Sequence, residues 1–334
     1  MNKNMKDNNL IVFDMDGVII DVSGSYRDTV RQTARLFFQG ADSWEKLPDP
    51  LFRLQDLAKV KQSGGLNNDW DLTFLVITLL CTLVEGSSGH DNPDAWLRYH
   101  KTISCCDVAS LGDFLHSVKN PITTLFEKYG KPKNEFISSL YIRDVGSGNI
   151  IKQMFQEIYL GKALFESTYG IPARIYNGEG YINRETSLVD KSVFEHLANR
   201  NTLAIATGRP RAEAEYPLKS FGLKKFFKVI YTLDDCLEEE QRIFAKEKRK
   251  VALSKPNPFM LDAVREACKR SFARHYYLGD MPDDMEAASR SRAKYIGIGI
   301  LISSSDKEHL KRDLLEAGAD YIIEEFAELM EIVR

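Results

Sequence analysis

Two aspartates separated by one residue follow a short apolar run near the start of the chain, in the stretch "NNLIVFDMDGVIID" at 8–21. In an extended chain Asp14 and Asp16 point to the same side, because side chains alternate with a period of two. One carboxylate can be a nucleophile that forms an aspartyl-phosphate, and the other can be a general acid and then a base. Alone, such a pair is more typical of a turn or a calcium-binding loop, so its chemistry depends on what else the fold brings to it.

Three later segments carry polar groups that phosphoryl transfer needs. "TLAIAT" ends in Thr207, "SKPNP" carries Lys255 at the start of an expected helix, and "HYYLGD" ends in Asp280. A hydroxyl and an ammonium can hold the oxygens of a transferring phosphoryl group, whose negative charge must be offset. Carboxylates can hold Mg²⁺, which prefers oxygen ligands. The set of residues therefore suits phosphoryl transfer.

Short apolar runs of strand length precede most of these polar groups. The expected strands are 10–13, 202–207, 228–232, 275–280, 295–301 and 320–324. Segments with helical periodicity lie between the later strands, which predicts parallel βαβ units with helices on both faces of the sheet. Ligands bind at the carboxyl ends of such strands. We therefore expect an α/β fold, a doubly wound, Rossmann-like parallel sheet that brings the polar groups to one edge.

The stretch between the first and second expected strands is long and helical in pattern. We interpret 24–185 as a mainly helical cap domain inserted after the first strand, which leaves a discontinuous catalytic core of 1–23 and 186–334. The apolar run 74–84 has eleven residues, too few for the roughly 20 that span a bilayer, so we expect a buried helix there. The dense mixed charge of 238–251 predicts a solvated helix or mobile loop.

Composition excludes several classes of function. The chain has 334 residues and a net charge of -3, which gives no basic field for nucleic acid. Five cysteines without a C-x-x-C pair indicate reduced thiols. The polar N-terminus has no apolar core of signal-peptide length. We expect a cytoplasmic protein without a membrane partner.

Four short motifs, in order, resemble those of the haloacid dehalogenase superfamily: "FDMDGV", "IATGRP", "SKPNP" and "YLGDMPDDMEAA". The resemblance is to phosphatase-type members with a helical cap inserted after the first strand, and phosphoglycolate phosphatase-like enzymes are the nearest class by motif style. It covers 8–23 and about 186–334 well and the inserted region only loosely. It implies Asp14 as the nucleophile and Asp16 as the acid and base, with Thr207 and Lys255 holding the phosphoryl group and the developing charge.

The resemblance also implies a metal site. Mg²⁺ would lie on Asp14, on the backbone carbonyl of Asp16 and on Asp280, and Asp284 would bind the metal or orient a water on it. Asp283 is the weaker candidate of the adjacent pair. An aspartate at the position of Asp16 separates phosphotransfer enzymes from dehalogenating relatives, which argues against dehalogenation.

Several residues are candidates for substrate contacts, each with a plainer alternative. They are Gly208, Arg209, Lys61, Asn67, Asn68 and Arg27. Gly208 and Arg209 follow the motif threonine, where a plain strand-to-loop turn is the alternative. The loop 61–70 is equally well explained by turn and N-cap chemistry, and Arg27 by a solvated first turn of a helix.

These observations favour a Mg²⁺-dependent phosphatase that hydrolyses a small phosphorylated metabolite through an aspartyl-phosphate. A phosphomutase of the same fold stays open as an alternative, and so does a non-catalytic binding protein that kept the fold. The natural substrate is not indicated, and a homodimer is left open.

Overall fold

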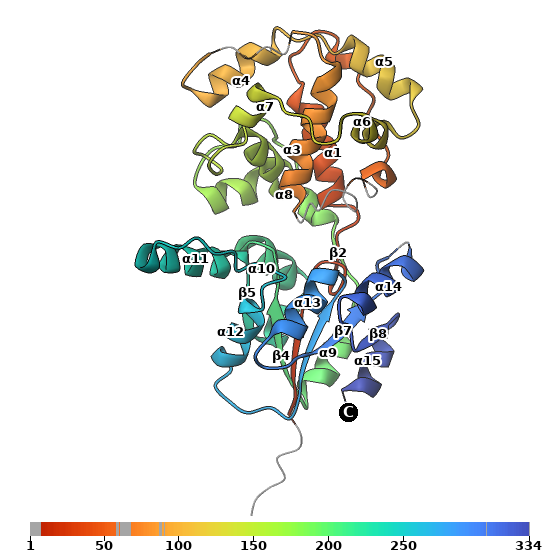
Figure 1. The fold of residues 1–334 in the computed structure, drawn as a ribbon, viewed down its shortest axis with the longest axis vertical. Helices are drawn as coiled ribbons and strands as arrows, with labels where there is room; N and C mark the ends of the chain where they lie inside the picture. The colour runs from red at the N-terminus through yellow and green to blue at the C-terminus, as the bar shows by residue number, and fades with distance from the viewer. Residues whose placement is uncertain are drawn as a thin grey trace, which may run out of the picture. The chain divides into compact units, whose positions relative to one another are not determined.

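The computed structural model describes residues 8–57, 60, 68–86, 89, 91–304 and 306–333. The chain forms two compact units: one ends at Val22 and resumes at Glu185, and the other spans Ser23–Arg184. Both boundaries lie one residue before the bounds expected from the sequence. The first unit is therefore discontinuous in sequence, and in Figure 1 its red N-terminal strand lies among strands from the second half of the chain.

The first unit is built on a six-stranded sheet of order β5-β4-β1-β6-β7-β8, in which every neighbouring pair is parallel. The strands are β1 (Leu10–Phe13), β4 (Thr202–Ala206), β5 (Phe227–Tyr231), β6 (His275–Gly279), β7 (Ile296–Ile300) and β8 (Tyr321–Ile323). From β1 the chain adds strands on one side, then returns to add the others on the opposite side. Ligands bind at such a reversal of strand order, just beyond the carboxyl ends of the strands.

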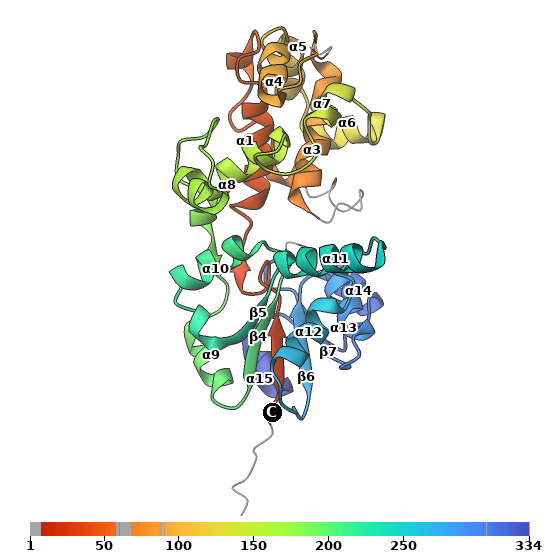
Figure 2. The ribbon, with the colours of Figure 1, turned by 90° about the vertical axis from the view of Figure 1, so that its left-hand side faces the viewer.

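Helices cover both faces of the sheet (Figures 1 and 2). Ile11 and Phe13 pack on one face against helices α9 (Lys191–Ala198), α10 (Arg211–Ser220) and α15 (Phe326–Ile332). Leu10 and Val12 pack on the other face against α11 (Leu233–Glu247), α12 (Phe259–Ala267) and α13 (Pro282–Arg290). A further helix, α14 (Lys307–Glu316), packs on α13. All four residues of β1 are fully buried, which explains its unbroken apolar sequence, and the doubly wound fold is confirmed.

The second unit is helical in the part of it that is described. Its helices are α1 (Tyr26–Phe37), α3 (Asp69–Leu80), α4 (Ala95–Ile103), α5 (Ala109–Ser117), α6 (Pro121–Tyr129), α7 (Glu135–Ser139) and α8 (Ile150–Tyr169). Short 3₁₀ helices are η1 (Trp44–Lys46), η2 (Cys81–Leu83) and η3 (Tyr181–Arg184), with η4 (Lys224–Phe226) in the first unit. Tyr26 of α1 stacks on Tyr159 of α8 with ring centroids 4.3 Å apart. The inserted helical domain is thus confirmed.

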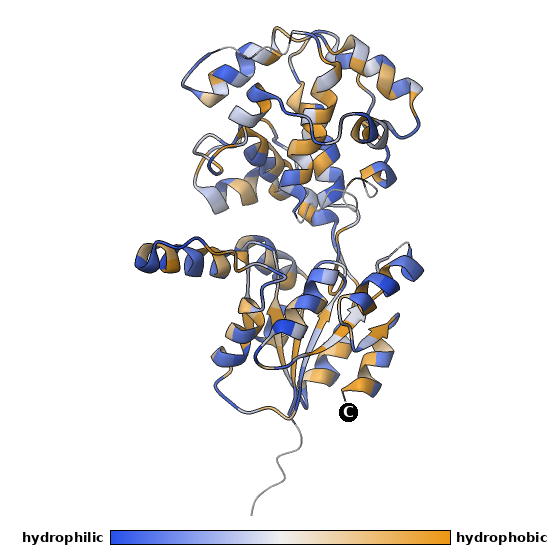
Figure 3. Ribbon diagram, in the orientation of Figure 1, coloured by the Kyte–Doolittle hydropathy of each residue, from blue (hydrophilic) through white to orange (hydrophobic). Residues whose placement is uncertain are grey.

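Figure 3 shows strong apolar colouring in the strands of the sheet, whereas apolar and polar colours alternate along the helices. The apolar run 74–84 forms most of α3 and then η2, and Val76, Ile77 and Leu80 are buried. Among the described residues no helix is long and apolar enough to cross a membrane. The charged segment 238–251 forms the greater part of α11, so a helix is the correct choice of the two expected for it.

Candidate active site

The candidate site lies where three strands end. Asp14 follows β1, Thr207 follows β4 and Asp280 follows β6. Since β1 pairs in parallel with both β4 and β6, these three residues leave the sheet at the same edge. Lys255 reaches the same place from the segment before α12. The structure therefore brings together residues that are more than 260 positions apart in sequence.

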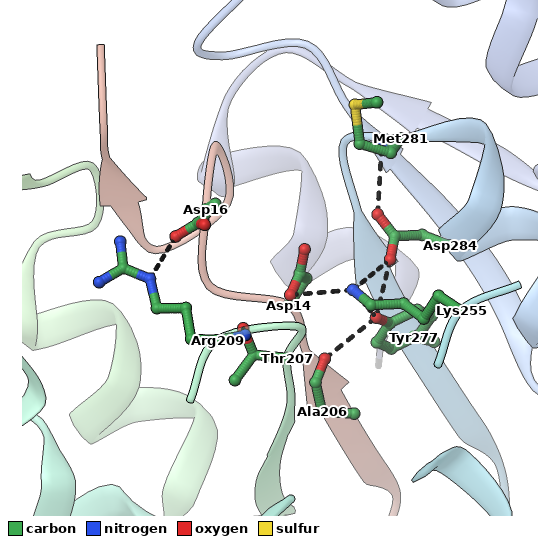
Figure 4. A network of polar contacts seen from close by, with 9 residues as sticks. All are labelled: Asp14, Asp16, Ala206, Thr207, Arg209, Lys255, Tyr277, Met281 and Asp284. Carbon is green, nitrogen blue, oxygen red and sulfur yellow. Dashed lines mark hydrogen bonds and ion pairs between the residues drawn. The ribbon is translucent and has the colours of Figure 1, made fainter. Parts of the chain in front are cut away.

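Lys255 bridges two carboxylates at this edge (Figure 4). Its Nζ lies 3.0 Å from Asp14 Oδ1 and 2.6 Å from Asp284 Oδ1. Carboxylate oxygens of Asp14, Asp280 and Asp284 all lie within 4.8 Å of one another. The neighbouring Asp283 is outside this group among the described residues. One ammonium thus pairs with two of the three clustered carboxylates.

Burial and crowding raise the pKa values of two of these acids, Asp14 and Asp280. Burial raises the pKa of Asp14 to about 7, the charge of Lys255 opposes this rise, and the charges of Asp284 and Asp16 add to it. Burial likewise raises the pKa of Asp280 well above its usual range, with Asp284 and Asp14 adding to the effect. Burial alone would lower the pKa of Lys255, but Asp14 and Asp284 raise it well above its ordinary value. The cluster therefore holds more carboxyl groups than one lysine can keep ionised.

This arrangement fits a divalent cation. Asp14 Oδ1 is buried and pairs with the Lys255 ammonium at 3.0 Å, but the same ammonium also pairs with Asp284. Buried charged oxygens are costly unless partners satisfy each of them. Carboxylate oxygens grouped this closely are the ligands that Mg²⁺ prefers. The side chains of Asp14, Asp280 and Asp284 therefore fit the metal site expected from the sequence, and the backbone carbonyl of Asp16 stays a prediction as its fourth ligand.

Two glycines allow the carboxylates to come this close. Gly17 has φ +68°, and a Cβ there would lie 2.0 Å from Asp280 Oδ2. A Cβ at Gly279 would lie 2.3 Å from the Cβ of Asp284. A side chain at either position would displace one of the acids, so both glycines are part of how the backbone places the cluster.

Tyr277 is a site residue that the sequence did not reveal. Its hydroxyl oxygen accepts a hydrogen bond from Lys255 Nζ at 3.0 Å. It also lies 2.9 Å from Asp284 Oδ1 and 3.2 Å from the carbonyl oxygen of Ala206. Tyr277 is on the buried strand β6, two residues before the fourth motif's glycine, where an apolar residue would have served the fold alone. The only signal in the sequence was a tyrosine hydroxyl in a buried strand, at the first residue of the fourth motif.

Asp16 has a different environment from Asp14. Its side chain is 36% exposed, and its Oδ1 lies 2.5 Å from Arg209 Nε. Arg209 is almost fully buried and also binds Glu185. In Figure 4 Asp16 lies beside Arg209, whereas Asp14 faces Lys255. The two motif carboxylates therefore have separate cationic partners, which suits separate roles.

Thr207 is buried, and its Oγ1 accepts a hydrogen bond from the backbone N–H of Arg209 at 3.3 Å. Gly208, between them, is exposed, and nothing lies within 4 Å of where its Cβ would be. Their expected contacts with a phosphoryl group or substrate stay predictions. The guanidinium of Arg209 has partners within the protein, and a substrate contact for it stays a prediction as well.

The remaining substrate candidates belong to the helical unit. Lys61 and Asn67 lie outside the described residues. Asn68 is the N-cap of α3, and its side chain accepts a hydrogen bond from the backbone N–H of Asp71 at 2.7 Å, which is the N-cap alternative noted for it. Arg27 is exposed in the first turn of α1. Neither observation tests a substrate contact.

Known proteins resemble this chain in sequence and fold. A curated protein named imidazoleglycerol-phosphate dehydratase, from Phytophthora nicotianae, is 23% identical over 293 residues, which are 86% of this chain and 42% of that protein. The chain thus spans less than half the length of this curated relative. A crystal structure of a structural genomics target is 24% identical with a TM-score of 0.63, over 98% of each chain. The phosphatase Tt82 from Thermococcus thioreducens is 18% identical with a TM-score of 0.52, over 92% of this chain and 99% of that one.

At these identities the two solved structures show a shared fold. The family model described as "haloacid dehalogenase-like hydrolase" matches residues 9–292, a range that begins before β1 and ends after α13. It includes Asp14, Thr207, Lys255 and Asp280, the residues that meet at the edge of the sheet. With this match over most of its length, the chain belongs to the haloacid dehalogenase-like hydrolases.

Proposed function

We propose that this hydrolase is a Mg²⁺-dependent phosphomonoesterase that acts on a small phosphorylated metabolite. The observation that carries the proposal is the cluster of Asp14, Asp280 and Asp284, in which the Lys255 ammonium pairs with Asp14 and Asp284. In this proposal a nucleophile, a fixed positive charge and a set of metal ligands share one site. Family membership supports the same reaction class.

In the first half of the reaction, an oxygen of the Asp14 carboxylate attacks phosphorus, and the bond between phosphorus and the ester oxygen breaks. Asp16, in its protonated form, gives its proton to the departing alcohol. The Lys255 ammonium, 3.0 Å from Asp14, offsets negative charge that develops on the phosphoryl oxygens. The product of this half is a phosphoryl group on Asp14 and a free alcohol.

In the second half, a water molecule attacks the phosphorus of the aspartyl-phosphate. Asp16, now ionised, takes the proton from that water, and the bond between phosphorus and the Asp14 oxygen breaks. Inorganic phosphate leaves, and both aspartates return to their starting states. The Thr207 hydroxyl, at the end of β4, is proposed to hold a phosphoryl oxygen in both halves.

Asp14, Asp280 and Asp284 would hold the Mg²⁺, together with the backbone carbonyl of Asp16. When bound, the ion supplies positive charge that neutralises the carboxylates and the phosphoryl oxygens. This matters for Asp14 in particular, because the nucleophile must be ionised and its pKa is raised to about 7 by burial. The positive charge of a cation favours that ionised form.

The test is release of inorganic phosphate from a panel of phosphorylated metabolites, with Mg²⁺ or with a chelator. The panel includes phosphoglycolate, sugar phosphates and imidazoleglycerol phosphate, the last because of the name of the Phytophthora nicotianae relative. We expect Mg²⁺-dependent release from at least one small ester, and none from the Asp14→Asn variant. If sugar phosphates are isomerised only when a bisphosphate activator is present, without phosphate release, the phosphomutase alternative replaces this proposal.

We also propose a cytoplasmic location and no nucleic-acid or membrane partner. The support is the absence of disulfides, since all five cysteines are free thiols, together with the net charge of -3. A homodimer stays open. Fractionation of cells that express the tagged chain would test the location.

A further inference from the structure

Arg209 and Glu185 form a buried ion pair behind the exposed side of Asp16. Arg209 Nη1 donates to Glu185 Oε2 at 3.0 Å, and Nη2 donates to Glu185 Oε1 at 3.2 Å. The side chains are 1% and 0% exposed, respectively. Nη1 also donates to the backbone carbonyl of Glu213 at 3.1 Å. The guanidinium is therefore held from two directions, and its plane is fixed.

The guanidinium also contacts Asp16, a residue of the first motif near the N-terminus. Arg209 Nε donates to Asp16 Oδ1 at 2.5 Å, across 193 positions of the chain. Two parallel hydrogen bonds to one carboxylate orient an arginine rigidly. Because the pair with Glu185 fixes the guanidinium, it also fixes the direction in which Nε points, and hence where the Asp16 carboxylate lies (Figure 4).

Folding alone gives little reason for such a pair. Taking two charges out of water is costly, and well-packed apolar residues often stabilise a fold as much or more. Here the buried pair ends on a carboxylate that is 36% exposed at the candidate site. The backbone N–H of Arg209 also donates to Thr207 Oγ1 at 3.3 Å. Arg209 therefore contacts two groups of the proposed reaction, Asp16 and Thr207.

We propose that Arg209, held by Glu185, is a positioning residue that sets the direction of the Asp16 carboxylate for proton transfer. This inference rests on the proposed phosphatase function. Proton transfer requires the acid within hydrogen-bond reach of the leaving oxygen, and a displacement of about 1 Å can cost about a hundredfold in rate. Loss of the pair would leave Asp16 present but misdirected.

The first test compares two esters in the Glu185→Gln variant. An alkyl alcohol is a poor leaving group and needs the proton from Asp16, whereas an acidic phenol leaves without it. We expect kcat for the alkyl phosphate to fall about tenfold or more with KM unchanged. With the aryl phosphate we expect a burst of phenol equal to the enzyme concentration, because the phenol leaves without a proton from Asp16. Slow turnover should follow, because the attack of water on the aspartyl-phosphate still needs Asp16 as base.

The second test is a double-mutant cycle with Asp16→Asn. If Glu185 acts through Asp16, adding Glu185→Gln to Asp16→Asn changes neither the burst nor the residual rate. Arg211→Lys is the matched control. Arg211 lies two residues after Arg209 and pairs with Asp235 at 2.7 Å. We expect its replacement to leave kcat for both esters unchanged.

A purely structural role predicts different results. Glu185→Gln would then lower kcat for both esters equally and make the burst of phenol smaller. It would also lower the residual activity of the Asp16→Asn protein. This pattern overturns the inference. If Glu185→Gln does not fold, the Glu185→Gln/Arg209→Gln protein leaves no lone buried charge and serves for the same comparisons. If wild-type protein hydrolyses neither ester, the proposed phosphatase function has failed. The wild-type measurement thus tests the function, and the variants test the positioning role.

Discussion

The hydroxyl oxygen of Tyr277, a fully buried side chain, and the ammonium nitrogen of Lys255, whose side chain is 14% exposed, lie 3.0 Å apart at the carboxyl edge of the sheet. Tyr277 also contacts Asp284 Oδ1 at 2.9 Å. A lysine side chain has a flexible four-carbon stem, so a fixed hydrogen-bond partner limits where its ammonium lies. The strand β6 thus contributes a side chain that holds the lysine of another motif in place.

Tyr277→Phe should impair catalysis through Lys255. We expect kcat to fall about tenfold and the free energy of unfolding to fall by about 1–2 kcal/mol, because a hydroxyl with several buried partners is lost. Steady-state kinetics and urea unfolding measure the two effects. Tyr276→Phe is the control: its hydroxyl donates to the Ile332 carbonyl at 3.3 Å on the other face of the sheet. It should cost stability without loss of kcat, and an equal loss of kcat in both variants would contradict this role for Tyr277.

Gly17→Ala should abolish metal binding. The new Cβ would lie 2.0 Å from Asp280 Oδ2, at a backbone φ of +68°, so Asp280 must move away from Asp14. Gly222→Ala separates the two causes, because Gly222 has φ +66° but open space around it. Both variants should lose about 1–2 kcal/mol from backbone strain. Only Gly17→Ala should lose the rise in melting temperature caused by Mg²⁺, and a retained rise would mean that the steric argument is wrong.

The pKa of Asp14 predicts how stability depends on pH without metal. Burial raises this pKa from 3.8 to about 7, so between these values the folded state keeps a proton that the unfolded state has lost. The folded state then binds more protons, and the free energy of unfolding falls as pH rises through this window. Chelator-treated protein should melt at a lower temperature at about pH 7.5 than at about pH 5.5, and the difference should be smaller in Asp14→Asn.

Mg²⁺ should reverse this dependence, because a cation binds the ionised carboxylates and stabilises the folded state that holds it. Its stabilising effect should be larger at the higher pH. Differential scanning calorimetry of wild-type, Asp14→Asn and Asp280→Asn proteins checks this. A Mg²⁺ effect of the same size in all three would argue against a site on these residues.

The sequence predicted the sheet and the four groups at its edge because each is a local signal. An unbroken apolar run such as 10–13 marks a strand buried on both faces, and the polar residue after it marks the strand end. The ribbon of β2 (Ile20–Asp21) with β3 (Thr186–Ser187) is antiparallel and was not predicted. Two residues per strand are too few for any periodicity to register.

The contacts that organise the site could not be predicted from the sequence, because they join residues that are distant along the chain. Arg209 follows its motif threonine and invited a phosphate contact, but its partners Asp16 and Glu185 are distant in sequence and meet only in the fold. Glu185 was expected as the last residue of the inserted domain, whereas it belongs to the sheet-containing unit. Tertiary ion pairs carry no local pattern, so only the three-dimensional structure identifies them.

Asp14 is the proposed nucleophile, and trapping a phosphoryl group on its carboxylate is the direct test of that role. Wild-type protein is mixed with Mg²⁺ and an intact phosphate ester that it hydrolyses. The mixture is quenched in acid within one turnover, and the protein is digested and examined by mass spectrometry. We predict the mass of one added phosphoryl group on the peptide that contains Asp14, and none in Asp14→Asn. Phosphate release without that modification, or unchanged turnover by Asp14→Asn, would contradict the mechanism.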